Sequence, residues 1–176
     1  MFSIIFIQEL RYWLKNPSFY IFMGVFLIAS MFVAAISAGI FDTVTATTGS
    51  SVIVNSPIEI ARMFMGLTSL SIFLFPSIIG VAIYRDYKSG IHALLHSYPF
   101  SKANFLLAKF FSGVLIVAVI VSMIGIGLFI GFRLPGTNQD IVAAFKLGSY
   151  LQTYLVFLLP NILFYGAIVF GVVAFT

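Results

Sequence analysis

Four long apolar runs dominate the pattern of hydrophobic and polar positions along this chain of 176 residues. They cover about residues 18–41, 58–84, 105–132 and 150–175. Each run is long enough to cross the hydrocarbon layer of a bilayer, which takes roughly 20 helical residues. Because lipid cannot hydrogen-bond the peptide backbone, such segments must be helices. The pattern therefore predicts an all-α, polytopic membrane protein whose residues 17–176 form a transmembrane domain.

The residues ahead of the first run predict a different kind of helix, which we place at residues 1–16. Asn16-Pro17 ends it, since a residue before proline disfavours the helical conformation and proline starts a new helix well. Its apolar positions share one face: Phe2, Phe6, Ile7, Leu10, Trp13 and Leu14. Its polar positions lie opposite: Gln8, Arg11 and Lys15. We interpret this as an interfacial elbow helix, characterised by Phe6, Leu10, Arg11, Trp13 and Lys15, which serves either as an anchor or in transmitting force.

The distribution of Lys and Arg predicts the orientation of the chain. Six basic residues fall on one side of the predicted membrane: Arg11, Lys15, Arg85, Lys88, Lys102 and Lys109. Three fall on the other: Arg62, Arg133 and Lys146. We therefore expect a cytoplasmic N-terminus in a multi-pass protein of the cell inner (plasma) membrane, with the 85–104 loop cytoplasmic as well.

This cytoplasmic loop contains a second amphipathic pattern. Four apolar residues share one face of a short predicted helix, which Ser89 caps and Pro99 ends: Ile91, Leu94, Leu95 and Tyr98. Such a helix is suited to docking a soluble partner, although an ordinary interfacial loop helix fits the spacing slightly better. His92 and His96 have the spacing of a zinc pair, but Ala93 stands where a metalloprotease needs Glu. We expect no metal site.

The predicted spans contain little polar chemistry. Glu59 and Arg62 lie three residues apart near the outer end of the second span, where we expect an ion pair. No carboxylate falls at mid-membrane, which argues against a proton- or sodium-driven carrier. Gly127 and Gly131 give the third span a face of small residues suited to close helix packing.

Composition narrows the possible functions further. Hydrophobic residues make up 61% and charged residues 8% of the chain, and there is no cysteine, so disulfides and thiolate metal sites are excluded. The basic residues form no run typical of nucleic-acid binding. There is no Gly-Lys-Ser/Thr phosphate loop and no Gly-x-Ser-x-Gly motif, so we expect no catalysis by the chain itself and no cofactor.

The residues around the cytoplasmic loop combine several short motifs. The stretch IYRDYKSGIHALLHSYPFSKANFLLAKF contains, in this order, an acidic residue, a glycine, an apolar turn, a proline and Ser-Lys, followed by an apolar run with a lysine. These positions are Asp86, Gly90, Leu94-Leu95, Pro99, Ser101-Lys102 and Lys109. In this order the motifs resemble those of ABC-2-type transporter permeases. The stretch LLPNILFYGAIVF is similar to permeases fused to an aminopeptidase-like domain.

The resemblance implies a membrane-spanning subunit that moves substrate by using ATP hydrolysis in a cytoplasmic ABC ATPase, and that pairs with a second permease copy or half. The ATPase would bind a coupling helix in the loop: Asp86, Gly90, Ile91, Leu94, Leu95, Tyr98 and Pro99. Such permeases have six spans, so we expect a longer protein beyond Thr176. The alternative is a membrane anchor or assembly subunit that tethers a downstream soluble domain.

Overall fold

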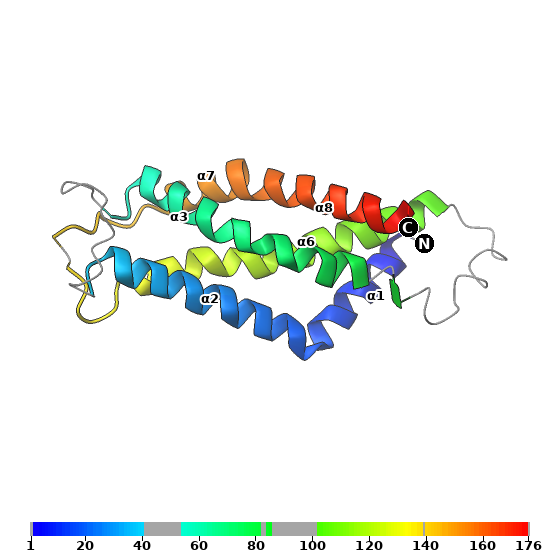
Figure 1. Ribbon diagram of the computed structural model, residues 1–176, viewed down its shortest axis with the longest axis horizontal. Coiled ribbons are helices and arrows are strands. Elements are labelled where there is room, and N and C mark those ends of the chain that lie inside the picture. Colours follow the sequence, from blue (N-terminus) through cyan, green and yellow to red (C-terminus); the bar gives the residue numbers. More distant parts are fainter. Residues whose placement is uncertain (1, 41–53, 82–83, 86–101, 139, 176) are drawn as a thin grey trace. The chain divides into compact units, whose positions relative to one another are not determined.

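The computed structural model describes residues 2–40, 54–81, 84–85, 102–138 and 140–175 (Figure 1). These residues form an all-α fold without a β-strand in the part of the chain that is described. Four helical segments are long and apolar enough to cross a membrane: Pro17–Ser37, Pro57–Gly80, Ala103–Gly131 and Leu147–Val173. The chain is a multi-pass membrane protein, as its hydrophobic pattern predicts.

The first two helices, α1 (Phe2–Lys15) and α2 (Pro17–Ser37), are separated by a single residue. Asn16 interrupts the helix and caps the next one, since its side-chain oxygen accepts a hydrogen bond of 3.1 Å from the backbone N–H of Ser18. The far end of α2 falls four residues before the predicted end of the span. There Gly39 adopts a left-handed φ of +80°, and Ile40 N–H bonds to Ala35 C=O in a Schellman motif.

The second and fourth spans depart from α-helical geometry near their prolines, whereas the third does not. The second span consists of α3 (Pro57–Ser69), a 3₁₀ turn η1 (Leu70–Phe73) and a π-helical turn η2 (Pro76–Gly80). The third is the uninterrupted helix α6 (Lys102–Gly131). The fourth consists of α7 (Leu147–Thr153), a π-helical turn η3 (Tyr154–Leu158) and α8 (Leu159–Phe175). Proline cannot donate the i→i−4 hydrogen bond, which accounts for irregular turns beside Pro76 and Pro160.

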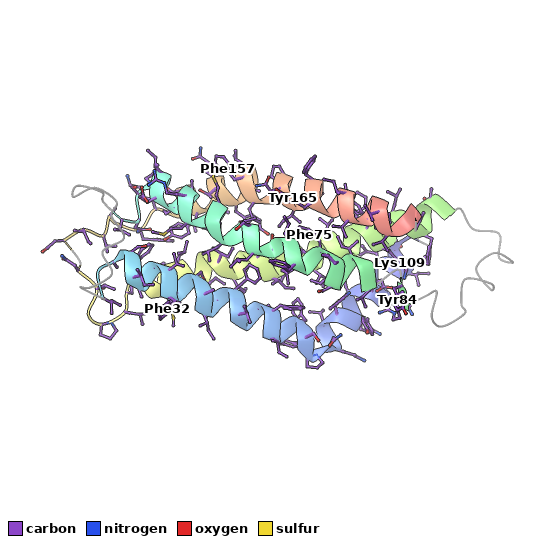
Figure 2. The ribbon with its side chains drawn as sticks, in the orientation of Figure 1. Phe32, Phe75, Tyr84, Lys109, Phe157 and Tyr165 are labelled. Atoms are coloured by element: carbon purple, nitrogen blue, oxygen red, sulfur yellow. The ribbon has the colours of Figure 1, made fainter. Side chains whose placement is uncertain are left out.

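The chain divides into two compact units, and the first comprises residues 1–19, 71–119 and 161–176. Its core contains Phe75, which is fully buried. The centroid of its ring lies 6.2 Å from the centroid of the Tyr165 ring (Figure 2). Glycines allow Ile79 to approach its neighbours closely. A Cβ added at Gly113 would lie 2.8 Å from Ile79 Cγ1, and one at Gly166 would lie 3.4 Å from Ile79 Cδ1.

The second unit comprises residues 20–70 and 120–160. Here α6 approaches α2 through its small residues, because a Cβ added at Gly127 would lie 2.5 Å from Leu27 O. A Cβ at Gly131 would lie 2.6 Å from Ala34 Cβ. The face of small residues predicted from the sequence therefore brings two helices together.

Many large apolar side chains remain exposed on the long helices. Phe32 on α2 and Phe157 in η3 keep 55% and 39% of their surface accessible (Figure 2). On a soluble protein such surface would promote aggregation, whereas on a membrane-spanning helix it contacts lipid tails.

Candidate functional site

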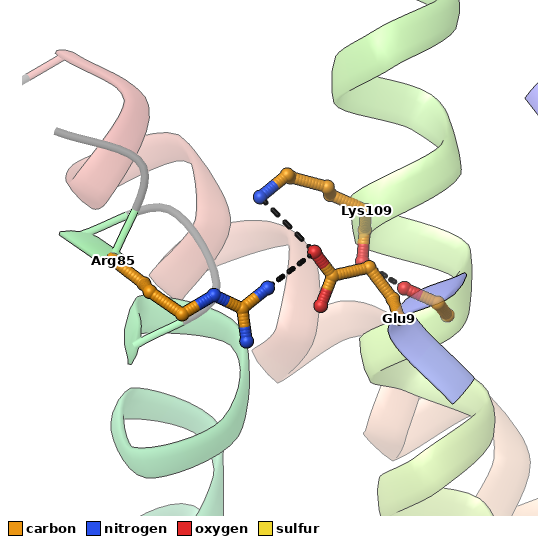
Figure 3. A network of polar contacts seen from close by, with 4 residues as sticks. Glu9, Arg85 and Lys109 are labelled. Atoms are coloured by element: carbon orange, nitrogen blue, oxygen red, sulfur yellow. Dashed lines mark hydrogen bonds and ion pairs between the residues drawn. The ribbon is translucent and has the colours of Figure 1, made fainter. Parts of the chain in front are cut away.

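A cluster of three charged residues lies inside the first unit, with the carboxylate of Glu9 at its centre (Figure 3). Glu9 Oε1 lies 2.6 Å from Arg85 Nη2 and 3.2 Å from Lys109 Nζ. Glu9 is 5% exposed and Lys109 2% exposed, so both charges are removed from solvent. One carboxylate oxygen therefore joins three segments of the chain: α1, residues 84–85 and α6.

The faces of α1 explain how Glu9 reaches this position. Glu9 and Trp13, four residues apart, form the buried side of the helix. Ile7 and Leu14 lie on the other edge of the apolar face and are 55% and 50% exposed. The prediction of one continuous apolar face is therefore incomplete. One edge packs against protein together with the carboxylate, while the other is left for lipid.

Arg85 is held between a carboxylate and an aromatic ring. Besides its ion pair with Glu9, its guanidinium carbon lies 4.0 Å from the centroid of the Tyr12 ring. Burial by itself lowers the pKa of Arg85, but hydrogen bonds and charge interactions with Glu9 and Tyr12 outweigh this effect and raise the pKa above its ordinary value. Arg85 thus stays charged at every physiological pH.

Lys109 is a charged residue within the apolar sequence of α6. Its ammonium lies 5.1 Å from the centroid of the Phe105 ring in addition to its contact with Glu9. One turn further on, Ser112 Oγ donates a hydrogen bond of 2.9 Å to the Lys109 carbonyl. An isolated ammonium in this environment would cost several kcal/mol, and a close carboxylate offsets much of that cost.

The second carboxylate oxygen of Glu9 is buried and accepts no hydrogen bond from any described residue. Two cations surround one anion, so the cluster carries a formal net charge of +1. It offers no nucleophile beside a base, and the described residues contain no group of three potential metal ligands among His, Cys, Asp and Glu. The arrangement is therefore suited to holding segments of the chain together.

The cluster joins α1 to the segments that lie directly before and shortly after residues 86–101 in the sequence. Arg85 directly precedes residues 86–101, and Lys109 lies two turns into the helix that follows them. Glu9 therefore ties α1 to residues on both sides of this stretch of sequence. A displacement of Arg85 or Lys109 must act on α1 through a buried ion pair, because separating the charges in a region of low dielectric constant is costly.

The residues predicted to form the coupling helix lie outside the described residues, so this assignment stays a prediction: Asp86, Gly90, Ile91, Leu94, Leu95, Tyr98 and Pro99.

The ion pair expected at the start of the second span is present, with Arg62 Nη1 at 2.8 Å from Glu59 Oε1. Glu59 is 11% exposed but Arg62 is 63% exposed, which limits the contribution of this pair to stability.

Among the elbow residues, Trp13 is 4% exposed and packs into the first unit, while Phe6 and Leu10 are half-buried. Arg11 and Lys15 are exposed, as their positions on the polar face predict.

The sequence interpretation missed the ion pairs of Glu9 with Arg85 and Lys109. A signal existed, since a lysine inside an apolar span and a lone carboxylate on a membrane helix each require a partner of opposite charge.

Comparison of the chain with protein-family models, with curated proteins and with solved structures finds no match.

Proposed function

We propose that this protein is the membrane-spanning permease subunit of an ABC-2-type transporter and moves substrate by using ATP hydrolysis in a cytoplasmic partner ATPase. The observation that carries the proposal is the joint ion pairing of Glu9 with Arg85 and Lys109. In such a transporter, motion of the ATPase must reach the spans through a cytoplasmic loop. A carboxylate that binds both flanks of one loop to an N-terminal helix is a means of passing on that motion.

The placement of positive charge supports an orientation in which this cluster faces the cytoplasm. Arg85 and Lys109 both belong to the side that carries six of the nine Lys and Arg residues. In this proposal the ATPase docks on the apolar face of residues 91–98, and a second permease copy or half completes the pathway in the plasma membrane. The chain itself does not hydrolyse ATP.

The docking step can be tested with the full-length protein purified from its own membrane. We expect a P-loop ATPase to co-purify, and we expect Leu94→Ser together with Leu95→Ser to release it. Ala93→Ser is the matched control, since residue 93 falls on the opposite face of the predicted helix. Retention of the ATPase by the double variant, with normal hydrolysis in the complex, would show that this helix is not the docking element.

The role of Glu9 is separable from docking. Glu9→Gln keeps the shape of the side chain but removes the anion, so we expect the ATPase to remain bound while its stimulation by the permease falls. Arg11→Gln, on the exposed face of the same helix, should leave stimulation unchanged. If no ATPase binds and a soluble domain follows Thr176, the chain is a membrane anchor or assembly subunit instead.

A further inference from the structure

Two adjoining cavities lie in the second unit, and they differ in chemistry. The larger has a volume of about 410 Å³ and is lined mainly by apolar side chains, including Phe64, Ile126 and Leu151. The smaller has a volume of about 200 Å³ and is lined by polar groups that include Asn55 and Arg133. Three aromatic residues line both: Phe129, Phe145 and Tyr150. The two cavities therefore adjoin at a shared aromatic wall and together offer an apolar end and a polar end.

A network of hydrogen bonds joins the segments that precede α3 and α7 at the polar end of the site. Asn55 donates from Nδ2 to Ala143 O at 2.9 Å and accepts from the Tyr150 hydroxyl at 2.7 Å. Residues 54 and 142 form a parallel bridge, with Val54 N–H bonded to Ile141 O at 2.8 Å. The Tyr150 ring also lies edge-on against Phe64, 6.3 Å between centroids. The site is thus formed before any ligand arrives.

The charge at the polar end is not balanced by protein groups in the described part of the chain. Arg133 is exposed, and its guanidinium carbon lies 4.1 Å from the centroid of the Phe129 ring. No described carboxylate forms an ion pair with it. A guanidinium presents a fork of donors that suits phosphate or carboxylate oxygens, so this end of the site is complementary to an anion.

The two ends are separated along the direction in which a lipid molecule extends. Ser122 lines the apolar cavity and Arg133 the polar one. Nine residues of α6 follow Ser122 before the helix ends at Gly131, which corresponds to about 14 Å at the helical rise of 1.5 Å per residue, and Arg133 lies two residues further on. Arg133 lies two residues beyond the end of the membrane-spanning helix, where a lipid headgroup is expected, whereas Ser122 lies two turns inside the span.

We propose that this site binds one anionic phospholipid, with the phosphate at Arg133 and one acyl chain in the apolar cavity. The volume of the apolar cavity falls within the range of small-molecule sites, and its lining carries no charged side chain. A zwitterionic lipid would present the same chain, but its own ammonium group would offset the attraction of the phosphate for Arg133. The proposal is independent of the transport function, since it requires only that the chain spans a membrane.

Native mass spectrometry of the full-length protein can measure this binding, with palmitoyl-oleoyl phosphatidylglycerol and the corresponding phosphatidylcholine as probes. We expect one phosphatidylglycerol to be retained preferentially. Arg133→Gln should weaken its binding by about tenfold, which corresponds to ~1.4 kcal/mol, and should leave phosphatidylcholine unaffected. Lys146→Gln is the matched control, because Lys146 is an exposed cation nearby that lines neither cavity.

The apolar end is tested by filling it. Ile126→Trp places a larger side chain in the cavity and should abolish preferential retention, whereas Ile28→Trp adds the same volume at an exposed position outside both cavities. Equal losses for Arg133→Gln and Lys146→Gln would reduce the effect to general surface charge and overturn the proposal. Unchanged retention in correctly folded Ile126→Trp would do the same. Tighter Arg133-dependent binding of oleate than of phosphatidylglycerol would exclude a phospholipid as the ligand.

Discussion

At the scale of single residues, the decisive feature is a carboxylate that is almost without contact with solvent. One carboxylate oxygen of Glu9 forms ion pairs with both Arg85 and Lys109. The removal of one partner from a buried ion pair destabilises the fold far more than the loss of an exposed pair does. Lys109 depends on this carboxylate most, because only 2% of its surface is exposed.

We therefore expect Glu9→Gln to lower the free energy of unfolding by about 3 kcal/mol, since it leaves two cations without their buried anion. The emission of Trp13 provides the measurement, because it is the single tryptophan of the chain and lies one turn from Glu9 on the same buried face. Arg11→Gln, at an exposed position of α1, should change stability by less than about 0.5 kcal/mol. Equal stability of the two variants would mean that the cluster is not essential to the fold.

Asn55 offers a second prediction at this scale. It is the one described residue other than glycine with a positive φ, +68°, and its side chain makes two hydrogen bonds. Asn55→Ala loses both bonds and strains the backbone, whereas Asn55→Gly loses the bonds alone. We expect the alanine variant to be less stable than the glycine variant by about 1 kcal/mol in thermal or denaturant unfolding. The reverse order would show that the positive φ carries no strain.

Some of these contacts can be predicted from the sequence, and others cannot. The Glu59–Arg62 pair follows from a spacing of three on one helix, which is local information. The contact between Glu9 and Arg85 joins positions 76 residues apart, so no periodicity can indicate it. Only the general requirement that buried charges have partners pointed toward such a contact.

At the scale of elements, hydrophobic run length predicts the spans because the thickness of the membrane fixes how many apolar residues a helix must have. The length of an apolar run predicts the position of the helix ends less well. The apolar sequence continues past Ser37 to Phe41, but the left-handed conformation of Gly39 stops α2 earlier. Whether a glycine ends a helix or lies within it depends on the backbone conformation that the surrounding fold imposes.

The packing of α6 against α2 gives a matched pair of glycine substitutions. Gly127→Ala brings a methyl group to 2.5 Å from Leu27 O, so the helices must separate, and we expect a loss of about 1–3 kcal/mol. Gly24→Ala, where no atom lies within 4 Å of the added Cβ, should instead stabilise α2 slightly through its higher helix propensity. Unfolding of the two variants under the same conditions provides the comparison.

At the scale of the whole molecule, the asymmetric distribution of positive charge favours the orientation that the proposed function requires. Six Lys and Arg residues belong to the side of the N-terminus and three to the other. This difference favours a cytoplasmic N-terminus, since loops rich in Lys and Arg are retained on the cytoplasmic side during insertion. If the orientation were reversed, the Glu9 cluster could not face a cytoplasmic ATPase.

The absence of cysteine from the chain makes this orientation directly measurable by labelling single-cysteine variants in intact cells. Ser3→Cys and Asp140→Cys both replace exposed residues, and they lie on opposite predicted sides of the membrane. We expect a membrane-impermeant maleimide to label Asp140→Cys in intact cells and to reach Ser3→Cys only after the membrane is opened. Labelling of both variants in opened membranes controls for access to the thiol. Labelling of Ser3→Cys in intact cells would place the cluster outside the cytoplasm, and the proposed coupling to an ATPase would then be wrong even though the four spans remained.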